Sequence, residues 1–196
     1  MLRQIICDKF REPILTFKAG LNAVIGDEVA SNSIGKSSIL MIIDFVFGGD
    51  SYIKANKDAV ENLGHHEFKF SFVFGEEELF FSRGTKDYKY TTICDGNYNP
   101  VKTIKTDEYT AMLKEKYQIT LKDISFRNIV GRYTRVYGKE NLNEKKPLQY
   151  FDKEPKKESI LALIKLFDKY QSIKEYELQI DKLTEELKSY VSIVEK

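Results

Sequence analysis

The stretch over residues 26–45, GDEVASNSIGKSSILMIIDF, constrains this chain most, because a polar segment ending in Gly-Lys-Ser-Ser changes abruptly to an apolar one. The short apolar run 21–25 before it predicts a buried strand. Residues 37–47 after it are apolar nearly all round, which predicts a buried helix that Gly48 and Gly49 end. A strand, a polar loop with Gly-Lys-Ser and a helix form the context that a Walker A phosphate-binding loop requires.

The chemistry of such a loop fits these residues. Backbone N–H groups and the positive end of the following helix converge on phosphate oxygens. Lys36 adds a full positive charge for the β- and γ-phosphates, and the Ser37 hydroxyl is placed for a magnesium ion. The front of the motif departs from GxxxxGK[ST], because Ala30 stands at the first glycine position. Either Ala30 takes that position, or the loop carries an insertion after Gly26.

Composition narrows the class of protein. A chain of 196 residues fits one domain, or one domain with an appendage. With 31 basic and 30 acidic residues the net charge is +1, so bulk charge points to neither nucleic acid nor membrane. Cys7 and Cys94 have no paired spacing and His residues do not cluster, which argues against a disulfide framework or a zinc site. The charged N-terminus does not resemble a signal peptide and no run has membrane-spanning length, so we expect a cytoplasmic protein.

The middle of the chain is rich in strand patterns. In HEFKFSFVF, residues 66–74, phenylalanines alternate with other residues, which predicts a strand with one buried face. ELFFSRG (78–84) and YKYTTIC (88–94) predict further strands, and Asp-Gly-Asn at 95–97 predicts a hairpin turn. The stretch 106–117 predicts a short helix with Thr106 as its N-cap.

A different pattern begins after Asp168. Apolar residues recur with heptad spacing, at Ile173, Tyr176, Ile180, Leu183, Leu187, Tyr190 and Val194. This spacing predicts the start of a coiled-coil arm over 169–196, after a lobe over 1–168; an amphipathic helix packed on its own domain is the alternative. The pattern runs to Lys196 without a terminating Gly or Pro, so we expect the chain to be the front part of a longer protein.

The stretch FKAGLNAVIGDEVASNSIGKSSILMIIDFVFGG resembles the start of the ATPase heads of the SMC, RecF and RecN class, where a Gly-Leu-Asn strand precedes a G-x-N-G-x-G-K-S loop. Asn32 matches the asparagine of that loop, whereas Ser33 stands where a further glycine is usual. The loop SNSIGKSS is most similar to bacterial SMC-like ATPases of phage-defence and related operons.

The resemblance implies an α/β P-loop NTPase of the ABC/SMC type, in which the N-terminal lobe has a mixed β-sheet around the helix and a coiled-coil helix emerges from it. ATP and Mg²⁺ are the implied cofactors, with Ser37 as metal ligand and Ser38 at the α-phosphate. The implied nucleotide-binding residues are Asn32, Ser33, Ile34, Gly35, Lys36, Ser37 and Ser38.

Two further motifs of that class are missing from the sequence. MIIDF lies on the helix after the loop and LIKLFD runs into the heptads, so neither is a Walker B strand, and no LSGG-like segment occurs. We therefore assign no catalytic residue and expect ATP hydrolysis only when a C-terminal half completes the head. The implied partners are that half, a second head in a homodimer, DNA in repair or phage defence, and possible effector subunits, but no membrane.

Two other functions stay open. A coiled-coil interaction protein with a vestigial loop is conceivable because of Ala30 and Ser33. A self-contained P-loop kinase or GTPase would need a Walker B aspartate that we do not find.

Several other side chains are weaker candidates. The pair His65 and His66 is read as polar strand-edge residues rather than metal ligands, and Lys54 and Lys57 as solvated lysines. Gln149 is a poor substitute for the glutamine that follows the β-rich lobe in the resembled class. The arginines that alternate with aromatic residues are read as structural or interfacial rather than as a nucleic-acid surface; they are Arg127, Arg132 and Arg135.

Overall fold

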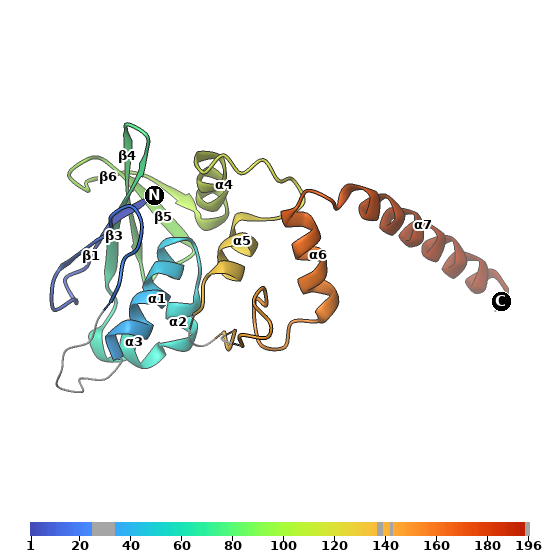
Figure 1. Ribbon diagram of the computed structural model, residues 1–196, viewed down its shortest axis with the longest axis horizontal. Helices are drawn as coiled ribbons and strands as arrows, with labels where there is room; N and C mark the ends of the chain where they lie inside the picture. Colours follow the sequence, from blue (N-terminus) through green and yellow to red (C-terminus); the bar gives the residue numbers. More distant parts are fainter. Residues whose placement is uncertain (25–33, 137–138, 142, 195–196) are drawn as a thin grey trace. The chain divides into compact units, whose positions relative to one another are not determined.

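The computed structural model describes residues 1–24, 34–136, 139–141 and 143–194, with the backbone alone at 34, 36, 193 and 194 (Figure 1). Contacts within the chain divide it into two compact units. The first comprises Met1–Thr120 with Ser125–Lys153, and the second Leu121–Ile124 with Glu154–Lys196. Each unit is described by itself.

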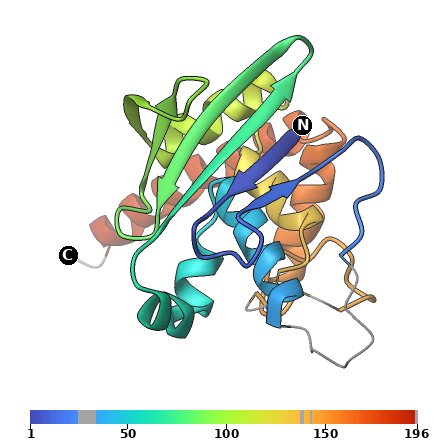
Figure 2. The same cartoon turned by 90° about the vertical axis from the view of Figure 1, so that its left-hand side faces the viewer.

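A six-stranded sheet of order β2-β1-β3-β4-β5-β6 forms the first unit, and every pairing among the described strands is antiparallel (Figure 2). Its strands are β1 Leu2–Ile6, β2 Ile14–Thr16, β3 Glu67–Phe74, β4 Glu77–Gly84, β5 Tyr90–Cys94 and β6 Pro100–Lys105. The helices of this unit are α1 Ile34–Val46, α2 Ser51–Ala55, α3 Lys57–Leu63, α4 Thr106–Lys116 and α5 Phe126–Tyr133.

Aromatic rings join the sheet to its helices. The predicted alternation in β3 is confirmed, because Phe68, Phe70 and Phe72 are fully buried on one face. The ring centroid of Phe45 on α1 lies 5.6 Å from that of Phe68. The ring centroid of Tyr109 on α4 lies 6.3 Å from that of Phe70. The core of the unit therefore lies between this face of the sheet and the helices α1 and α4.

The predicted strands at 78–84 and 88–94 are confirmed as β4 and β5, and the turn at 95–97 joins β5 to β6. The Asp95 carboxylate fixes this turn by accepting the backbone N–H groups of Asn97 and Asn99, each at 2.9 Å. The Asn99 side-chain amide also donates to Oδ2 at 2.9 Å, and this bond, together with the two backbone bonds, holds the pKa of Asp95 below its usual range.

Gly48 and Gly49 end α1, as the sequence predicts. Gly48 has a φ of 87°, and its N–H donates to the Phe45 carbonyl at 2.9 Å while the Gly49 N–H donates to the Asp44 carbonyl at 2.8 Å. This pair of bonds is the Schellman arrangement, which needs a left-handed residue after the helix. A Cβ at Gly49 would lie 2.1 Å from Asp44 Oδ2, so this position also excludes a side chain.

Side chains from three other elements bind the last carbonyls of α1. Arg83 of β4 donates through Nη1 to the carbonyls of Phe45 and Gly49. The hydroxyl of Tyr109 donates to the Val46 carbonyl at 2.8 Å, and Arg127 of α5 donates to the Phe47 carbonyl at 3.0 Å. Helix ends leave these acceptors without partners inside the helix, so α1 is fixed at its C-terminal end by the sheet, α4 and α5.

Asp44, one turn before the end of α1, forms a buried ion-pair network. Its side chain is fully buried, and Oδ1 accepts from Arg127 Nη2 at 2.6 Å and from Lys139 Nζ at 3.1 Å. Burial on its own raises the pKa of a carboxyl, but the two cations outweigh burial and the pKa of Asp44 lies below its ordinary value. Asp44 is therefore a structural charge, as expected for an acid of MIIDF on the helix rather than on a Walker B strand.

The prediction of a mixed sheet is wrong for the described residues, because all their strand pairs are antiparallel. The predicted strand at 21–25 is also wrong over 21–24, which form no strand, and Ile25 lies outside the described residues. Leu21 is 87 % exposed and Val24 54 %. A strand exists only when its backbone pairs with a neighbour, and no described strand pairs with residues 21–24.

The N-cap of α4 differs from the prediction by one residue. The helix begins at Thr106 with Lys105 as N-cap and no side-chain capping bond. The Thr106 hydroxyl instead donates to the Tyr88 carbonyl at 3.3 Å, because its backbone N–H is held by the Lys89 carbonyl in the extension of the β5–β6 ladder.

The second unit contains α6, Lys156–Leu166, and α7, Gln171–Val194, joined by a turn in which Asp168 has a φ of 55°. Lys174 of α7 pairs with Asp123 at 2.7 Å, and Lys165 lies 4.2 Å from the centroid of the Tyr170 ring. The helix predicted from the heptads is confirmed; its seam residues are 60 to 67 % exposed at Tyr176, Ile180, Leu183, Leu187 and Tyr190. The coiled coil and the boundary at 168 stay predictions.

We expect Asp44→Asn to lower the free energy of unfolding by about 3 kcal/mol or more, because it leaves the partly buried cations Arg127 and Lys139 without their carboxylate. The matched control is Asp50→Asn, which breaks the exposed pair with Lys54 and should cost no more than about 1 kcal/mol. Urea unfolding measures both. Because the folded-state pKa of Asp44 is lowered, its contribution is complete at neutral pH and is lost only as the pH falls below about 4. An equal effect of the two variants would contradict the network.

A peptide of residues 169–196 should show little helix by circular dichroism at micromolar concentration. Most of the stability of an amphipathic helix comes from packing of its apolar face, and the exposed seam of α7 has nothing to pack against until a second helix covers it. The measurement is repeated over a range of concentrations. A helical signal that grows with concentration would indicate that α7 pairs with itself as a parallel dimer.

Candidate nucleotide site

The Gly-Lys-Ser-Ser segment lies in the first turn and a half of α1, which begins at Ile34. Gly35 is exposed, and Ser37 and Ser38 are partly buried. Of the other predicted site residues, Ile34 and Lys36 are described by their backbone alone, and Asn32 and Ser33 lie outside the described residues. The structure thus places four consecutive predicted residues, 35 to 38, at one helix N-terminus. Their roles in nucleotide binding stay predictions.

The start of α1 suits a phosphate. The first backbone N–H groups of a helix have no partner inside the helix and carry the positive end of its dipole. The first turn of α1 contains no Asp or Glu that would compete for them. A Cβ built on Gly35 would meet no described atom within 4 Å. A hydroxyl at Ser37, the residue after the lysine, is the donor type that Mg²⁺ takes.

The segment that leads toward the loop is held by Asn22. Its side chain accepts the Lys18 N–H at 3.0 Å and donates to the Lys18 carbonyl at 2.8 Å, around Gly20 with a φ of 86°. Residues 21–24 then line a cavity of about 1030 Å³ together with strands β1 and β2 and with Ile39 of α1. The Gly-Leu-Asn segment predicted to flank the loop therefore lies beside the second turn of α1.

The two histidines have structural roles. His66 is buried, and its Nε2 lies 2.9 Å from the Tyr52 hydroxyl while its Nδ1 lies 2.8 Å from the Gly64 carbonyl. His65 Nδ1 lies 3.3 Å from the Thr85 hydroxyl. Within the described ranges, no group of three His, Cys, Asp or Glu side chains could hold a metal ion. Both His residues are therefore read as part of the packing beside β3.

The arginines of the α5 region bind within the protein. Arg127 is held by Asp44, and Arg132 is 2 % exposed and donates to the Leu148 carbonyl at 2.7 Å. Arg135 donates to the Pro147 carbonyl. These contacts agree with the structural interpretation of Arg127, Arg132 and Arg135. Gln149 is also buried, and its amide donates to the Asp152 carbonyl.

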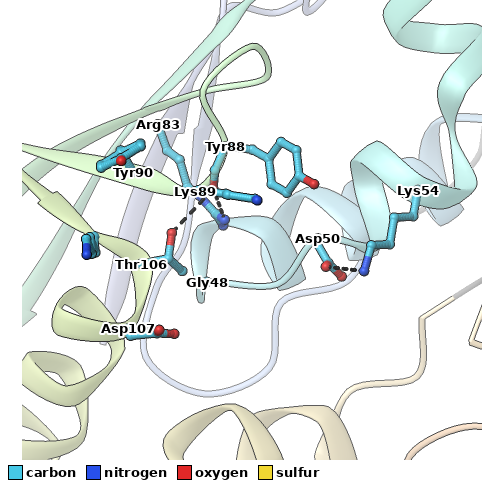
Figure 3. A pocket seen from close by; sticks show the side chains of 10 residues that line it. Gly48, Asp50, Lys54, Arg83, Tyr88, Lys89, Tyr90, Thr106 and Asp107 are labelled. Carbon is cyan, nitrogen blue, oxygen red and sulfur yellow. Dashed lines mark hydrogen bonds and ion pairs between the residues drawn. The ribbon is translucent and has the colours of Figure 1, made fainter.

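A second cavity, of about 610 Å³, opens at the other end of α1 (Figure 3). It is not evident from the sequence, because its residues come from five separate segments. The signal that could have been used is the alternation of aromatic and basic residues at 88–90. The lining residues are Gly48, Asp50, Lys54, Arg83, Tyr88, Lys89, Tyr90, Lys105, Thr106 and Asp107.

A model of a protein family described as an AAA domain matches residues 7–193, which is nearly the whole chain. The chain belongs to the AAA domain family. Membership implies a P-loop NTPase that binds ATP, typically with Mg²⁺, and agrees with the position of Gly-Lys-Ser-Ser at the start of α1. Comparisons with curated proteins and with solved structures found no match. Among the described residues of this AAA domain, no helix has the length and apolar character needed to cross a membrane.

Gly35→Ala should separate stability from nucleotide binding. The backbone at Gly35 is helical, and a Cβ meets no described atom, so the free energy of unfolding should stay unchanged or rise by up to about 1 kcal/mol. ATP binding should weaken, because the glycine allows the backbone to approach a phosphate closely. Urea unfolding and calorimetric titration with ATP measure the two effects. Unchanged affinity would mean that the phosphates do not contact this turn.

Proposed function

We propose that this chain is the ATP-binding N-terminal half of an SMC-like ATPase head. It would close with a second head around ATP and Mg²⁺ and so drive a conformational change on DNA, in repair or phage defence. The observation that carries the proposal is the position of residues 35–38 in the first turn and a half of a helix whose other end is fixed by Arg83, Tyr109 and Arg127.

Each predicted residue has a distinct task in this proposal. Lys36 neutralises the β- and γ-phosphates, Ser37 holds the magnesium ion, and Ser38 contacts the α-phosphate. Asn32, Ser33, Ile34 and Gly35 supply the loop around them. Bound Mg²⁺ would bridge the phosphates and spread their charge. These contacts bind the ground state and the transition state alike, so they favour binding more than turnover.

Two exposed apolar surfaces support the need for a C-terminal half. Leu21 and Val24 are exposed beside the start of α1, where a paired strand would cover them. The seam of α7 exposes five large side chains on one helix, where a returning antiparallel helix would cover them. Apolar side chains gathered in this way usually mark an interaction surface. We propose the C-terminal half of the same head as the partner, with a second head as homodimer and possible effector subunits beyond it.

Hydrolysis needs an acid that holds the metal or activates a water, and the sequence offers no Walker B strand to supply it. The acid of MIIDF, Asp44, is fully buried and its Oδ1 accepts from Arg127 and Lys139, so we read it as a structural charge rather than a catalytic acid. We therefore propose ATPase activity only for the completed head. A self-contained P-loop kinase or GTPase lacks support for the same reason.

The second candidate is a coiled-coil interaction protein with a vestigial loop. The observation in its favour is the exposed seam of α7, together with Ala30 and Ser33 in place of loop glycines. Nucleotide binding distinguishes the two functions, because a vestigial loop would not bind ATP.

Calorimetry should detect Mg²⁺-dependent ATP binding to the chain, and Lys36→Ala should weaken it by about tenfold or more, because charge-assisted hydrogen bonds to phosphate are lost. The matched control is Lys57→Ala, an exposed lysine of α3. Phosphate release should stay near background until the C-terminal half is added. Robust hydrolysis by residues 1–196 alone, abolished by Lys36→Ala, would contradict the half-head proposal, and absent ATP binding would favour the vestigial loop.

A further inference from the structure

The cavity at the C-terminal end of α1 is separate from the candidate nucleotide site. Its residues all belong to the first unit, and α1, 13 residues long, separates it from the Gly-Lys-Ser-Ser segment by about 20 Å. At about 610 Å³ it has room for a nucleotide-sized group. Figure 3 shows Arg83, Lys89, Tyr90 and Thr106 around one side of it and Asp50 and Lys54 at the other.

Basic side chains outnumber acidic ones in this cavity, four to two. Asp50 is already paired with Lys54 at 2.6 Å, which neutralises both. Lys89 and Lys105 are exposed, and no ion pair involves them among the described residues. Asp107, in the first turn of α4, is the remaining acid, so the cavity keeps a net positive charge.

Arg83 adds a buried charge beneath the cavity. Its side chain is 2 % exposed, and within the described residues its guanidinium donates to the carbonyls of Phe45, Gly49 and Tyr88. Carbonyls satisfy its hydrogen bonds but carry no net charge, and burial lowers the pKa of Arg83 to about 10, so it remains charged at neutral pH. A buried cation without a carboxylate partner attracts an anion that enters the cavity.

Tyr90 and Lys105 place an aromatic ring beside a cation. They are direct partners in the antiparallel β5–β6 ladder, so their side chains lie on the same face of the sheet. Tyr90 is 47 % exposed, which is unusual for a ring that has a sheet to pack against. An exposed aromatic ring next to basic side chains is the arrangement on which single-stranded nucleic acid stacks its bases.

We propose that this cavity binds single-stranded DNA, with two backbone phosphates held by Lys89 and Lys105, one by each lysine, and a base stacked on Tyr90. The inference rests on the DNA partner of the proposed function and gives that partner a place on the chain. Single-stranded DNA is favoured over a duplex because the exposed ring needs an unstacked base.

The first test compares the salt dependence of binding. A fluorescein-labelled oligothymidine of about 12 nucleotides is titrated with the full chain and followed by anisotropy. In Lys89→Gln/Lys105→Gln, the slope of log affinity against log salt should be shallower by about 1.4 than in the wild type. The ratio of the wild-type affinity to the variant affinity should therefore fall by about sevenfold when the salt rises from about 50 to about 200 mM. The matched control is Lys86→Gln/Lys102→Gln, which removes two exposed lysines of the same segments outside the cavity.

The second test compares two exposed tyrosines. Tyr90→Ala should weaken binding of the oligonucleotide by about fivefold or more, because a stacking partner is lost. Tyr133→Ala removes an exposed ring of α5, from the segment where arginines and aromatic residues alternate, and should leave the affinity unchanged. Circular dichroism and ATP binding of each variant report on folding and on the nucleotide site.

The outcomes separate this inference from the proposed function. If the wild type binds the oligonucleotide and the cavity variants bind equally well, or if the control lysines or Tyr133 matter as much, DNA binds elsewhere and the cavity proposal is wrong. If the wild type does not bind, the DNA partner itself is wrong. If excess ATP displaces the oligonucleotide from Lys36→Ala, the cavity takes free nucleotides, which also overturns it. A duplex that binds as tightly as the single strand would contradict the role of Tyr90.

Discussion

The hydrogen bonds that Arg83 donates to the last carbonyls of α1 are the contact on which the rest of this AAA domain depends. They join the sheet to the helix that carries the Gly-Lys-Ser-Ser segment, and Tyr109 and Arg127 add α4 and α5 to the same helix end. The guanidinium also lies 4.1 Å from the centroid of the Phe45 ring, so the polar contact continues directly into the aromatic core. The C-terminal end of α1 is thus fixed by three other elements, while its N-terminal end carries the candidate nucleotide site.

Charge at this helix end is arranged in two different ways. Asp44 binds Arg127 and Lys139 and offsets one of their two positive charges, whereas the described hydrogen bonds of Arg83 go to carbonyls, which carry no net charge. In the first arrangement, removing the carboxylate would leave two cations without their counter-charge, which is destabilising. The second leaves a positive field on the side where the cavity opens. The C-terminal end of α1 therefore adjoins both a structural charge network and a cavity able to attract anions. The two candidate binding sites of the domain lie at opposite ends of α1.

The sequence predicts well wherever a local pattern decides the outcome. The alternation of phenylalanines in β3, the Asp-Gly-Asn turn, the two glycines after α1 and the heptads of α7 all depend on neighbours a few residues away. It fails at 21–24, because an apolar run forms a strand only with a partner, and partners are not encoded in the run itself. Arg83 and Lys105 could not be assigned a role, since β4 and β6 reach α1 only through the folded sheet. The Gly-Lys-Ser-Ser motif of the candidate site can be found in the sequence, but the side-chain contacts that hold the C-terminal end of its helix cannot.

The strand order has a consequence for how the domain folds. From β3 to β6 every strand pairs with the next one along the chain. This meander therefore consists of local contacts, which form quickly during folding. β1 instead pairs with β3, Ile5 opposite Phe70, and closes a loop that contains β2, α1 and the whole phosphate-binding segment. Closing that loop lowers the entropy of the chain before the contacts between β1 and β3 contribute any stabilisation. The helix α1 with its Gly-Lys-Ser-Ser segment should therefore be the last part of the sheet-bearing unit to acquire order, and a ligand bound at its start would act on the final step of folding rather than on the folding nucleus.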